Sequence, residues 1–332
     1  MAERLYLVTG GAGHLGTAII TQLVQKGCRV RALVLPNEAN APQGALEIYH
    51  GDVCSKDSLR AFFAHDAEQA LVVIHCAGIV SIASRYNQKV FDVNVTGTKN
   101  IVDLCVEYGA ARLVHVSSVH AIPEQPHGTS IAEASAFSAD TVVGLYAQTK
   151  AQATAYVLQA AANGLHASVV HPSGICGPYD NGRGHLTTLV TEYCRHRLTA
   201  ALEGGYDFVD VRDVANGIVQ CCEKGGRGEC YILSNRFYTM REILTLLHDI
   251  TGQKAIKTYL PLWFVRFTAP LAEKCYALRR QPPLFTAYSI YTLTTNAHFS
   301  HAKAEEVLGY TTRDMRETLV DTVAWLREKG RI

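Results

Sequence analysis

Short apolar runs alternate with amphipathic stretches through the first half of the chain. The runs have the length and continuous hydrophobicity of strands that are buried on both faces of a parallel sheet. Predicted strands occupy residues 5–8, 29–35, 46–51, 71–75, 112–117 and 166–171. The stretches between them carry apolar residues at helical spacing and predict helices at residues 17–26, 56–63, 88–108 and 142–163. This alternation predicts an α/β fold with a doubly wound parallel sheet of the Rossmann type.

The pattern becomes less regular after Pro172. Glycine-rich connections are followed by two predicted strands, at residues 208–211 and 229–233. Predicted helices occupy residues 214–223, 240–251, 302–308 and 315–329. We therefore expect a dinucleotide-binding domain over residues 1–174 and a smaller substrate-binding lobe over residues 175–332, interleaved with the sheet.

Three glycines lie between the first predicted strand and the first predicted helix. Gly10 allows a tight turn, Gly13 lets a pyrophosphate approach the backbone, and Gly16 lets the helix pack on the strand. His14 and Leu15 lie in the same turn, where the helix N-terminus attracts an anion. The turn therefore predicts a dinucleotide site.

Further candidate residues lie where later strands end, because a sheet of this kind binds its ligands at the carboxyl edge. Ala77 and Gly78 are small enough for a ligand to lie close to the backbone. The candidates at this edge are Asp52, Val53, Ala77, Gly78, Ser118 and Pro172.

The end of the second strand usually selects between NAD and NADP. An acidic residue there binds a free ribose 2′-hydroxyl, and a basic one binds a 2′-phosphate. Val34 and Leu35 occupy this place, so neither device is present in its usual form. His14 and Arg31 are the nearby groups that favour a phosphate, which gives NADP a slight preference and leaves the choice open.

Tyr146 and Lys150 are four residues apart on the predicted helix at residues 142–163 and therefore share a face. An ammonium group beside a phenol lowers the phenol's pKa, as does a nearby oxidised nicotinamide, and Tyr146 could then exchange a proton near neutral pH. Ser118, at a strand end, could hydrogen-bond the same substrate oxygen. The pair alone is also compatible with an ordinary solvated helix face.

Composition narrows the class of partner. The formal net charge of the 332 residues is +1, which argues against a nucleic-acid partner or an acidic membrane surface and favours a small molecule. The ten cysteines show no Cys-x-x-Cys spacing, so we expect reduced thiols, no metal site and a cytoplasmic protein. We also expect no signal peptide before the first strand, and residues 260–278 are too interrupted by charge and proline for a membrane span.

These motifs together resemble the extended short-chain dehydrogenase/reductases over nearly the whole chain. The likeness is strongest to the branch of the NAD-dependent epimerase/dehydratase superfamily that contains 3β-hydroxysteroid dehydrogenases and dihydroflavonol 4-reductases. It rests on the turn at residues 9–16, the Asp52-Val53 pair, residues 76–78, residues 94–100, residues 116–118, residues 146–150, residues 171–178 and residues 211–215. His171 stands where the family more often has arginine.

The resemblance implies a role for each matched residue. Tyr146 would be the general acid/base, Lys150 would lower its pKa and hold the nicotinamide ribose, and Ser118 would orient the substrate oxygen. Ser117 is the less favoured serine, and Asn94 would act either structurally or in a proton relay. The implied enzyme interconverts a secondary alcohol and a ketone with NAD or NADP.

The substrate class rests on aromatic residues. The family branch and the rings at positions 263, 264, 267, 276, 285, 288 and 291 favour an apolar, steroid-like or polyphenolic substrate, although these rings could equally be core. His120 and Tyr179 follow strand ends and are further substrate-binding candidates. A nucleotide-sugar 4-epimerase and a catalytically silent, cofactor-sensing regulator remain the alternatives.

The family also implies a homodimer formed by the helices at residues 88–108 and 142–163. The residues that could form this interface, or else the core of the monomer, are Val90, Val93, Ile101, Leu104, Tyr156 and Val157.

Overall fold

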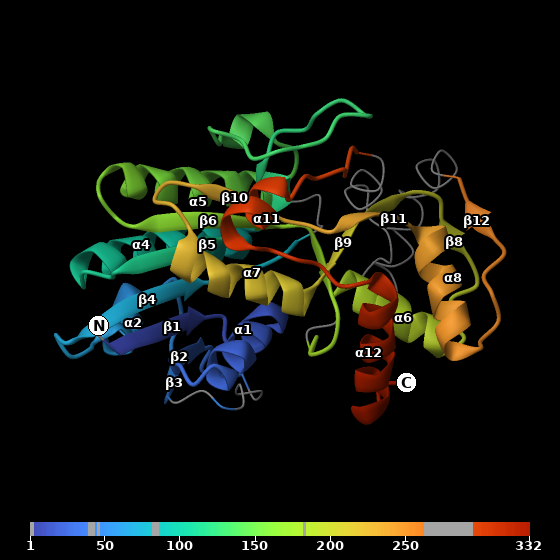
Figure 1. Ribbon diagram of the computed structural model, residues 1–332, viewed down its shortest axis with the longest axis horizontal. Coiled ribbons are helices and arrows are strands. Elements are labelled where there is room, and N and C mark those ends of the chain that lie inside the picture. Colours follow the sequence, from blue (N-terminus) through green and yellow to red (C-terminus); the bar gives the residue numbers. More distant parts are fainter. Residues whose placement is uncertain (1–2, 39–43, 45–46, 82–85, 182–183, 262–294) are drawn as a thin grey trace.

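The computed structural model describes residues 3–38, 44, 47–81, 86–181, 184–261 and 295–332. Its centre is a seven-stranded, entirely parallel sheet in the order β10-β6-β5-β4-β1-β2-β3, as Figure 1 shows. The strands are β1 (Glu3–Thr9), β2 (Arg29–Val34), β3 (Glu47–His50), β4 (Gln69–His75), β5 (Arg112–Val116), β6 (Ala167–Pro172) and β10 (Cys230–Leu233). The predicted doubly wound α/β fold is confirmed.

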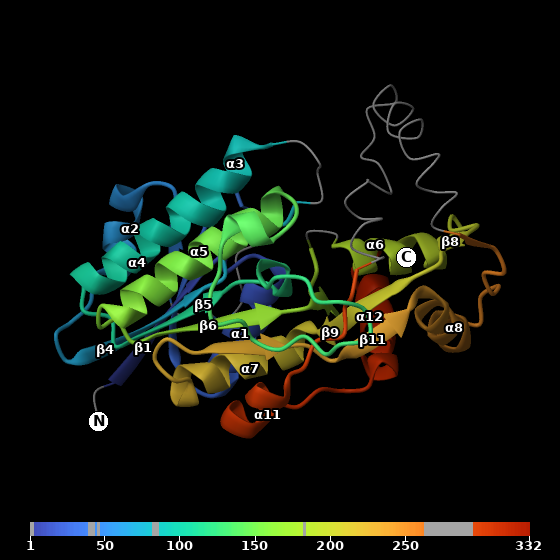
Figure 2. The ribbon, with the colours of Figure 1, turned by 90° about the horizontal axis from the view of Figure 1, so that it is seen from above.

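Helices cover both faces of this sheet, on opposite sides in Figure 2. One face carries α2 (Lys56–Phe63), α4 (Gly97–Glu107) and α5 (Leu145–Ala162). The other carries α1 (His14–Gln25), α7 (Val211–Lys224) and α11 (Ala302–Leu308). Each layer buries aliphatic side chains against the sheet, which explains why a central strand such as β4 is apolar on both faces over residues 71–74.

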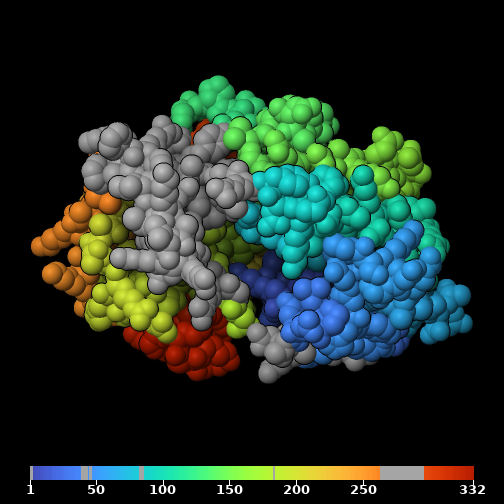
Figure 3. Space-filling model, turned by 180° about the vertical axis from the view of Figure 1, so that it is seen from behind, coloured from blue at the N-terminus to red at the C-terminus, as the bar shows by residue number. Residues whose placement is uncertain are grey.

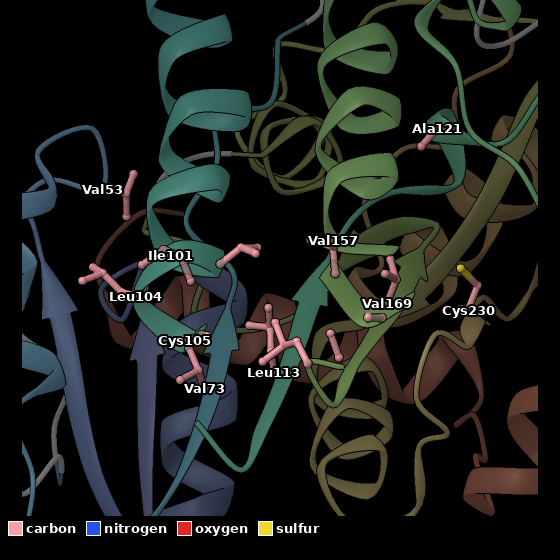
Figure 4. Packing of buried hydrophobic residues seen from close by; sticks show 14 of the residues in the cluster. Val53, Val73, Ile101, Leu104, Cys105, Leu113, Ala121, Val157, Val169 and Cys230 are labelled. Atoms are coloured by element: carbon pink, nitrogen blue, oxygen red, sulfur yellow. The ribbon is translucent and has the colours of Figure 1, made fainter. Parts of the chain in front are cut away.

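The layer under α4 and α5 is the core that supports the candidate site. Figure 4 shows Val73 and Leu113 of the sheet beside Leu104 of α4 and Val157 of α5. All four side chains are almost completely buried. Burying a side chain of this size stabilises a fold by roughly 1.5–3 kcal/mol relative to leaving it in water, so α4 and α5 are held firmly on the sheet.

The predicted helix at residues 88–108 forms as three consecutive segments. These are α3 (Gln88–Phe91), a π-helical turn η1 (Asp92–Thr96) and α4. A π turn adds a residue to the helical repeat and is frequent at functional sites. Asn94 lies within it.

After β6 the chain builds a second region and then returns to the first sheet. A three-stranded sheet has the order β11-β9-β7, from β7 (Gly174–Cys176), β9 (Gly205–Asp210) and β11 (Arg236–Thr239). Beside it pack α6 (His185–Cys194), α8 (Met240–Thr251) and α12 (Met315–Glu328). A short parallel pair joins β8 (Ala201–Leu202) to β12 (Tyr259–Leu260). Strand β10 is one of the seven strands of the main sheet, although it follows the expected domain boundary at residue 174. Residues on both sides of that boundary therefore form the sheet.

Ion pairs connect this region to the end of the chain. Asp210 caps α7 by accepting a hydrogen bond from the backbone N–H of Arg212, at 2.7 Å. The Arg212 guanidinium also reaches Asp321 of α12, at 2.6 Å, and Arg313 reaches Asp213 of α7, at 2.8 Å. Helix α12 is thereby fastened to the helix that covers the main sheet.

Candidate functional site

The glycine turn between β1 and α1 is tightly packed. Gly10 has a φ of 69°, which favours glycine, and a Cβ at this position would lie only 2.9 Å from the Cα of Ala77. A Cβ on Gly16 would overlap the carbonyl oxygen of Gly10. Helix α1 begins at His14, and Gly13 offers no side chain to cap it. The first-turn N–H groups therefore remain for an anion, and the turn fits a dinucleotide pyrophosphate.

His14 and Leu15 belong to the packing of this turn. His14 Nε2 lies 2.8 Å from the carbonyl oxygen of Pro178, and burial lowers the pKa of the imidazole. A neutral histidine here ties the turn to the loop after β7. Leu15 is buried against the core beneath α1.

The residues at the neighbouring strand ends lie along the same edge. The Asp52 carboxylate accepts a hydrogen bond from the backbone N–H of Cys54, at 2.9 Å. Val53 is buried, and a Cβ on Gly97 would lie 2.6 Å from its side chain. The Ala77 N–H donates to the hydroxyl of Thr9, at 3.1 Å.

Gly78 faces the candidate catalytic helix. A Cβ at this position would lie 3.3 Å from Lys150 Nζ and 3.2 Å from the side-chain oxygen of Asn94. The loop after β4 therefore approaches α5 as closely as a glycine allows. Pro172, the last residue of β6, is buried at the same edge.

Ser118, Tyr146 and Lys150 come together at this edge. Ser118 follows β5, and its hydroxyl hydrogen-bonds the Tyr146 phenol. Tyr146 and Lys150 lie one turn apart on α5 and are only 7% and 6% exposed. Ser117 points elsewhere, since its hydroxyl lies 2.7 Å from that of Thr154 on α5.

Burial controls the protonation of both residues on α5. It raises the pKa of Tyr146 to about 12, against which the hydrogen bond with Ser118 acts. It lowers the pKa of Lys150 to about 8. The Lys150 ammonium donates to the carbonyl oxygen of Val116, at 2.8 Å. The lowered pKa that we expected for Tyr146 is therefore not a property of the protein by itself, because desolvation outweighs the other contributions.

Asn94 holds the loop after β4 against α5. Its side-chain oxygen accepts a hydrogen bond from the N–H of Ile79, at 2.8 Å, and its amide donates to the Ile79 carbonyl, at 3.0 Å. The same amide donates to the Thr149 hydroxyl, at 3.1 Å, and that hydroxyl donates to the carbonyl of Tyr146, at 2.8 Å. Of the two roles considered for Asn94, these contacts favour the structural one.

An aromatic wall stands beside Tyr146. The His120 ring meets the Tyr146 ring edge-on, with centroids 5.9 Å apart. Tyr206 of β9 stacks on the His120 ring, with centroids 5.8 Å apart and an interplanar angle of 15°. Burial lowers the pKa of His120 to about 4, so the wall is neutral at pH 7. Sequence reasoning missed Tyr206, because no local signal shows which strand of the second sheet faces α5.

A comparison with known protein families shows the family to which the chain belongs. Residues 6–234 match the NAD dependent epimerase/dehydratase family. The chain belongs to this family. The resemblance to the extended short-chain dehydrogenase/reductases is thereby confirmed, as is the prediction of an enzyme of that type.

Individual relatives match from end to end. The sterol demethylase protein B of Methylococcus capsulatus is 31% identical, with 98% of this chain and 99% of that protein covered. A putative dihydroflavonol 4-reductase of Synechocystis is 28% identical and covers 98% of this chain and 95% of that protein. The crystal structure of gox2253 superimposes with a TM-score of 0.85 at 27% identity, over 99% of each chain.

The turn and strand ends described above are where this NAD-dependent family would bind its cofactor. The two groups that gave NADP a slight preference are both engaged elsewhere. Arg31 pairs with Glu47 of β3, at 2.7 Å, and also donates to the carbonyls of Phe62 and Ala64. His14 is neutral and bonded to Pro178. Neither side chain offers a free positive charge to a 2′-phosphate.

Tyr179 lies in the segment that follows β7. It has a φ of 75°, which is rare for a tyrosine, and it packs against the core formed by α6, α8 and α12. The seven aromatic residues between positions 263 and 291 lie outside the described residues. The substrate-binding role of Tyr179 stays a prediction.

The candidate dimer residues of this family member belong largely to its own core. Val90, Ile101, Leu104 and Val157 are buried within the single chain, and Val93 and Tyr156 are partly buried. The homodimer itself stays a prediction.

A hollow lies between the blue N-terminal segments and the yellow-green segments near residue 190 when the molecule is seen from behind (Figure 3).

Among the residues that the structure describes, no helix has the length and hydrophobicity needed to cross a membrane.

Proposed function

We propose that this protein is an NAD-dependent dehydrogenase/reductase that interconverts a secondary alcohol and a ketone on an apolar, ring-shaped substrate. One observation carries the proposal: Ser118, Tyr146 and Lys150 meet at the cofactor edge of the sheet beside a neutral aromatic wall. The steroid-like or polyphenolic class that we expected fits this wall.

The proton chemistry belongs to the protein's own residues. At neutral pH Tyr146 is a phenol, since burial raises its pKa to about 12, and it can donate its proton to a carbonyl oxygen. Ser118 orients that oxygen with a second hydrogen bond. When bound, the dinucleotide supplies or accepts the hydride. In the oxidative direction Tyr146 receives the proton of the alcohol, and a charged Lys150 stabilises the phenolate.

The aromatic wall favours an apolar substrate over a nucleotide sugar. A diphosphate is usually bound by cationic side chains. Beyond His120 and Tyr206, the next rings are those of Phe208 and Phe299, with centroids 6.0 Å and 6.3 Å from that of Tyr206. None of these four carries a charge at neutral pH. A flat hydrocarbon ring would stack on such a wall, and the names of the sterol and dihydroflavonol relatives agree with that substrate class.

Glu38 supports NAD as the cofactor. Its side chain turns back to the end of β2, where the carboxylate accepts a hydrogen bond from the Leu35 N–H, at 3.1 Å. A negative charge is thereby placed where sequences of this fold usually carry an acidic residue at the strand end itself. It would accept a hydrogen bond from a ribose 2′-hydroxyl and repel a 2′-phosphate.

A direct test follows nicotinamide absorbance with hydroxysteroids, flavonoids and UDP-sugars, each with NAD and NADP. Net formation of NADH with a hydroxysteroid or flavonoid is the expected result. Conversion of a UDP-sugar without net change of the cofactor would instead identify a 4-epimerase. Dinucleotide binding without turnover of any compound would identify a silent, cofactor-sensing protein and contradict the proposal.

A further inference from the structure

Tyr206 reaches the candidate catalytic residues from outside the main sheet. It lies on β9 of the three-stranded sheet, 86 residues along the chain from His120. Its hydroxyl lies 3.0 Å from His120 Nε2, and the two rings are nearly parallel. A stacked pair that is also hydrogen-bonded has little freedom to rotate.

His120 in turn contacts both Ser118 and Tyr146, so that fixing its ring also restricts these two side chains. Its backbone N–H donates to the hydroxyl of Ser118, at 3.3 Å. Its ring edge packs against the ring of Tyr146 at an interplanar angle of 71°. A displacement of His120 would therefore disturb both members of the Ser118–Tyr146 hydrogen bond.

Tyr206 is itself fixed by its surroundings. The rings of Phe208 and Phe299 meet it edge-on. On the β7 side, a Cβ on Gly174 would lie 3.0 Å from the Tyr206 ring. Its backbone pairs with Tyr238 in the ladder between β9 and β11. The second sheet thus presents a rigid phenol to His120.

We propose that Tyr206 is a positioning residue that acts through His120 to hold Ser118 and Tyr146 in the arrangement that proton transfer requires. The proposal rests on the function proposed above. Small errors in the placement of reacting groups slow a reaction strongly, whereas they change substrate binding little. Because Tyr206 belongs to the three-stranded sheet, the positions of Ser118 and Tyr146 would also depend on how that sheet packs against the seven-stranded sheet.

The substitution Tyr206→Phe tests the proposal because it keeps the ring and removes the hydroxyl. We expect kcat to fall about tenfold while KM changes less than twofold. NADH affinity, measured by fluorescence, should not change. Tyr238→Phe is the matched control, since Tyr238 is the cross-strand neighbour of Tyr206 and its hydroxyl accepts a bond from the Asn235 amide, at 3.4 Å. It should leave kcat within twofold of the wild type.

A double-mutant cycle shows whether Tyr206 acts through His120. In a protein that already carries His120→Phe, the further change Tyr206→Phe should have no additional effect on kcat, because the hydrogen bond is already lost. Equal effects of Tyr206→Phe in both backgrounds would overturn the proposal. A rise in KM with unchanged kcat would do the same, because it would show that the Tyr206 hydroxyl contributes to substrate binding and not to the placement of the catalytic residues.

One measurement needs no substrate and separates this proposal from the proposed function. Nuclear magnetic resonance of the histidine rings should show a changed His120 signal in Tyr206→Phe and an unchanged one in Tyr238→Phe. If no compound is turned over but these signals behave as expected, the proposed function fails while the link between Tyr206 and His120 stands. If His120 gives the same signal in all three proteins, the positioning role is wrong.

Discussion

At the scale of single residues, the protonation of Tyr146 in the protein alone favours the reductive direction of the proposed reaction. Burial keeps Tyr146 protonated far above neutral pH, which is the state that donates a proton to a ketone oxygen. The Lys150 ammonium is bound to the Val116 carbonyl and titrates within an accessible range. The pH dependence of reduction should therefore report Lys150 and not Tyr146.

Lys150 gives a prediction with a defined sign. Its pKa is lowered to about 8, so the ammonium is present below that pH and is lost above it. We expect kcat/KM for ketone reduction to fall as the pH rises through about 8. Lys150→Arg should be slower but should lose this midpoint, because a guanidinium stays protonated. The same midpoint near pH 8 in both proteins would show that another group is responsible.

At the scale of elements, we propose that the end of β2 selects between NAD and NADP. Arg31 is part of the contact between β2 and β3, where it pairs with Glu47, and it also donates to two carbonyls at the end of α2. The Glu38 carboxylate lies at the Leu35 N–H. Under the proposed assignment, the end of β2 would present the negative charge of Glu38 to the adenosine ribose, while the charge of Arg31 is paired with Glu47.

Removing the Glu38 charge should weaken the choice of NAD over NADP. In Glu38→Gln we expect the dissociation constant of NADPH to fall about tenfold, while that of NADH changes little or rises slightly. Titration calorimetry measures both without any substrate. Asp57→Asn, on α2, is the control for a general loss of negative charge. Wild-type protein that binds NADPH as tightly as NADH would contradict the assignment.

The elements also show what the sequence could and could not predict. The glycine turn and the Tyr146–Lys150 face follow from spacing within one strand, turn or helix, and the structure has both as predicted. The π turn around Asn94 does not follow, because the apolar spacing of residues 88–108 is equally compatible with one regular helix. Tyr206 and the position of Arg31 depend on contacts between distant segments. Local pattern holds no information about such contacts.

At the scale of the whole molecule, buried neutral histidines make the fold sensitive to acid. Burial lowers the pKa of His75 to about 3 and that of His171 to about 4, and it lowers that of His115 far below its usual value. Burial also lowers the pKa of His120, to about 4. All four should bind a proton near pH 6.5 once the chain unfolds. The unfolded state therefore binds more protons below that pH, and stability is lost as the pH falls.

His115 offers the clearest test, since neither of its ring nitrogens has a hydrogen-bond partner among the described residues. Each buried neutral histidine of this kind should lower the free energy of unfolding by about 1.4 kcal/mol for every pH unit below pH 6.5. His115→Leu should therefore show a weaker decline of the thermal midpoint between pH 7 and pH 5. The exposed His127→Gln is the control. An equally steep decline in His115→Leu would contradict this account of acid sensitivity.

The central claim is that the proton of the reaction belongs to Tyr146. The most direct measurement compares wild-type protein with Tyr146→Phe for nicotinamide-linked turnover and, on the same samples, for NADH affinity. The account predicts that turnover falls about 100- to 10,000-fold, because one general acid/base is removed, while the dissociation constant of NADH stays within about threefold, because the phenol contributes little to the glycine-turn site. Turnover by Tyr146→Phe at the wild-type rate would contradict it.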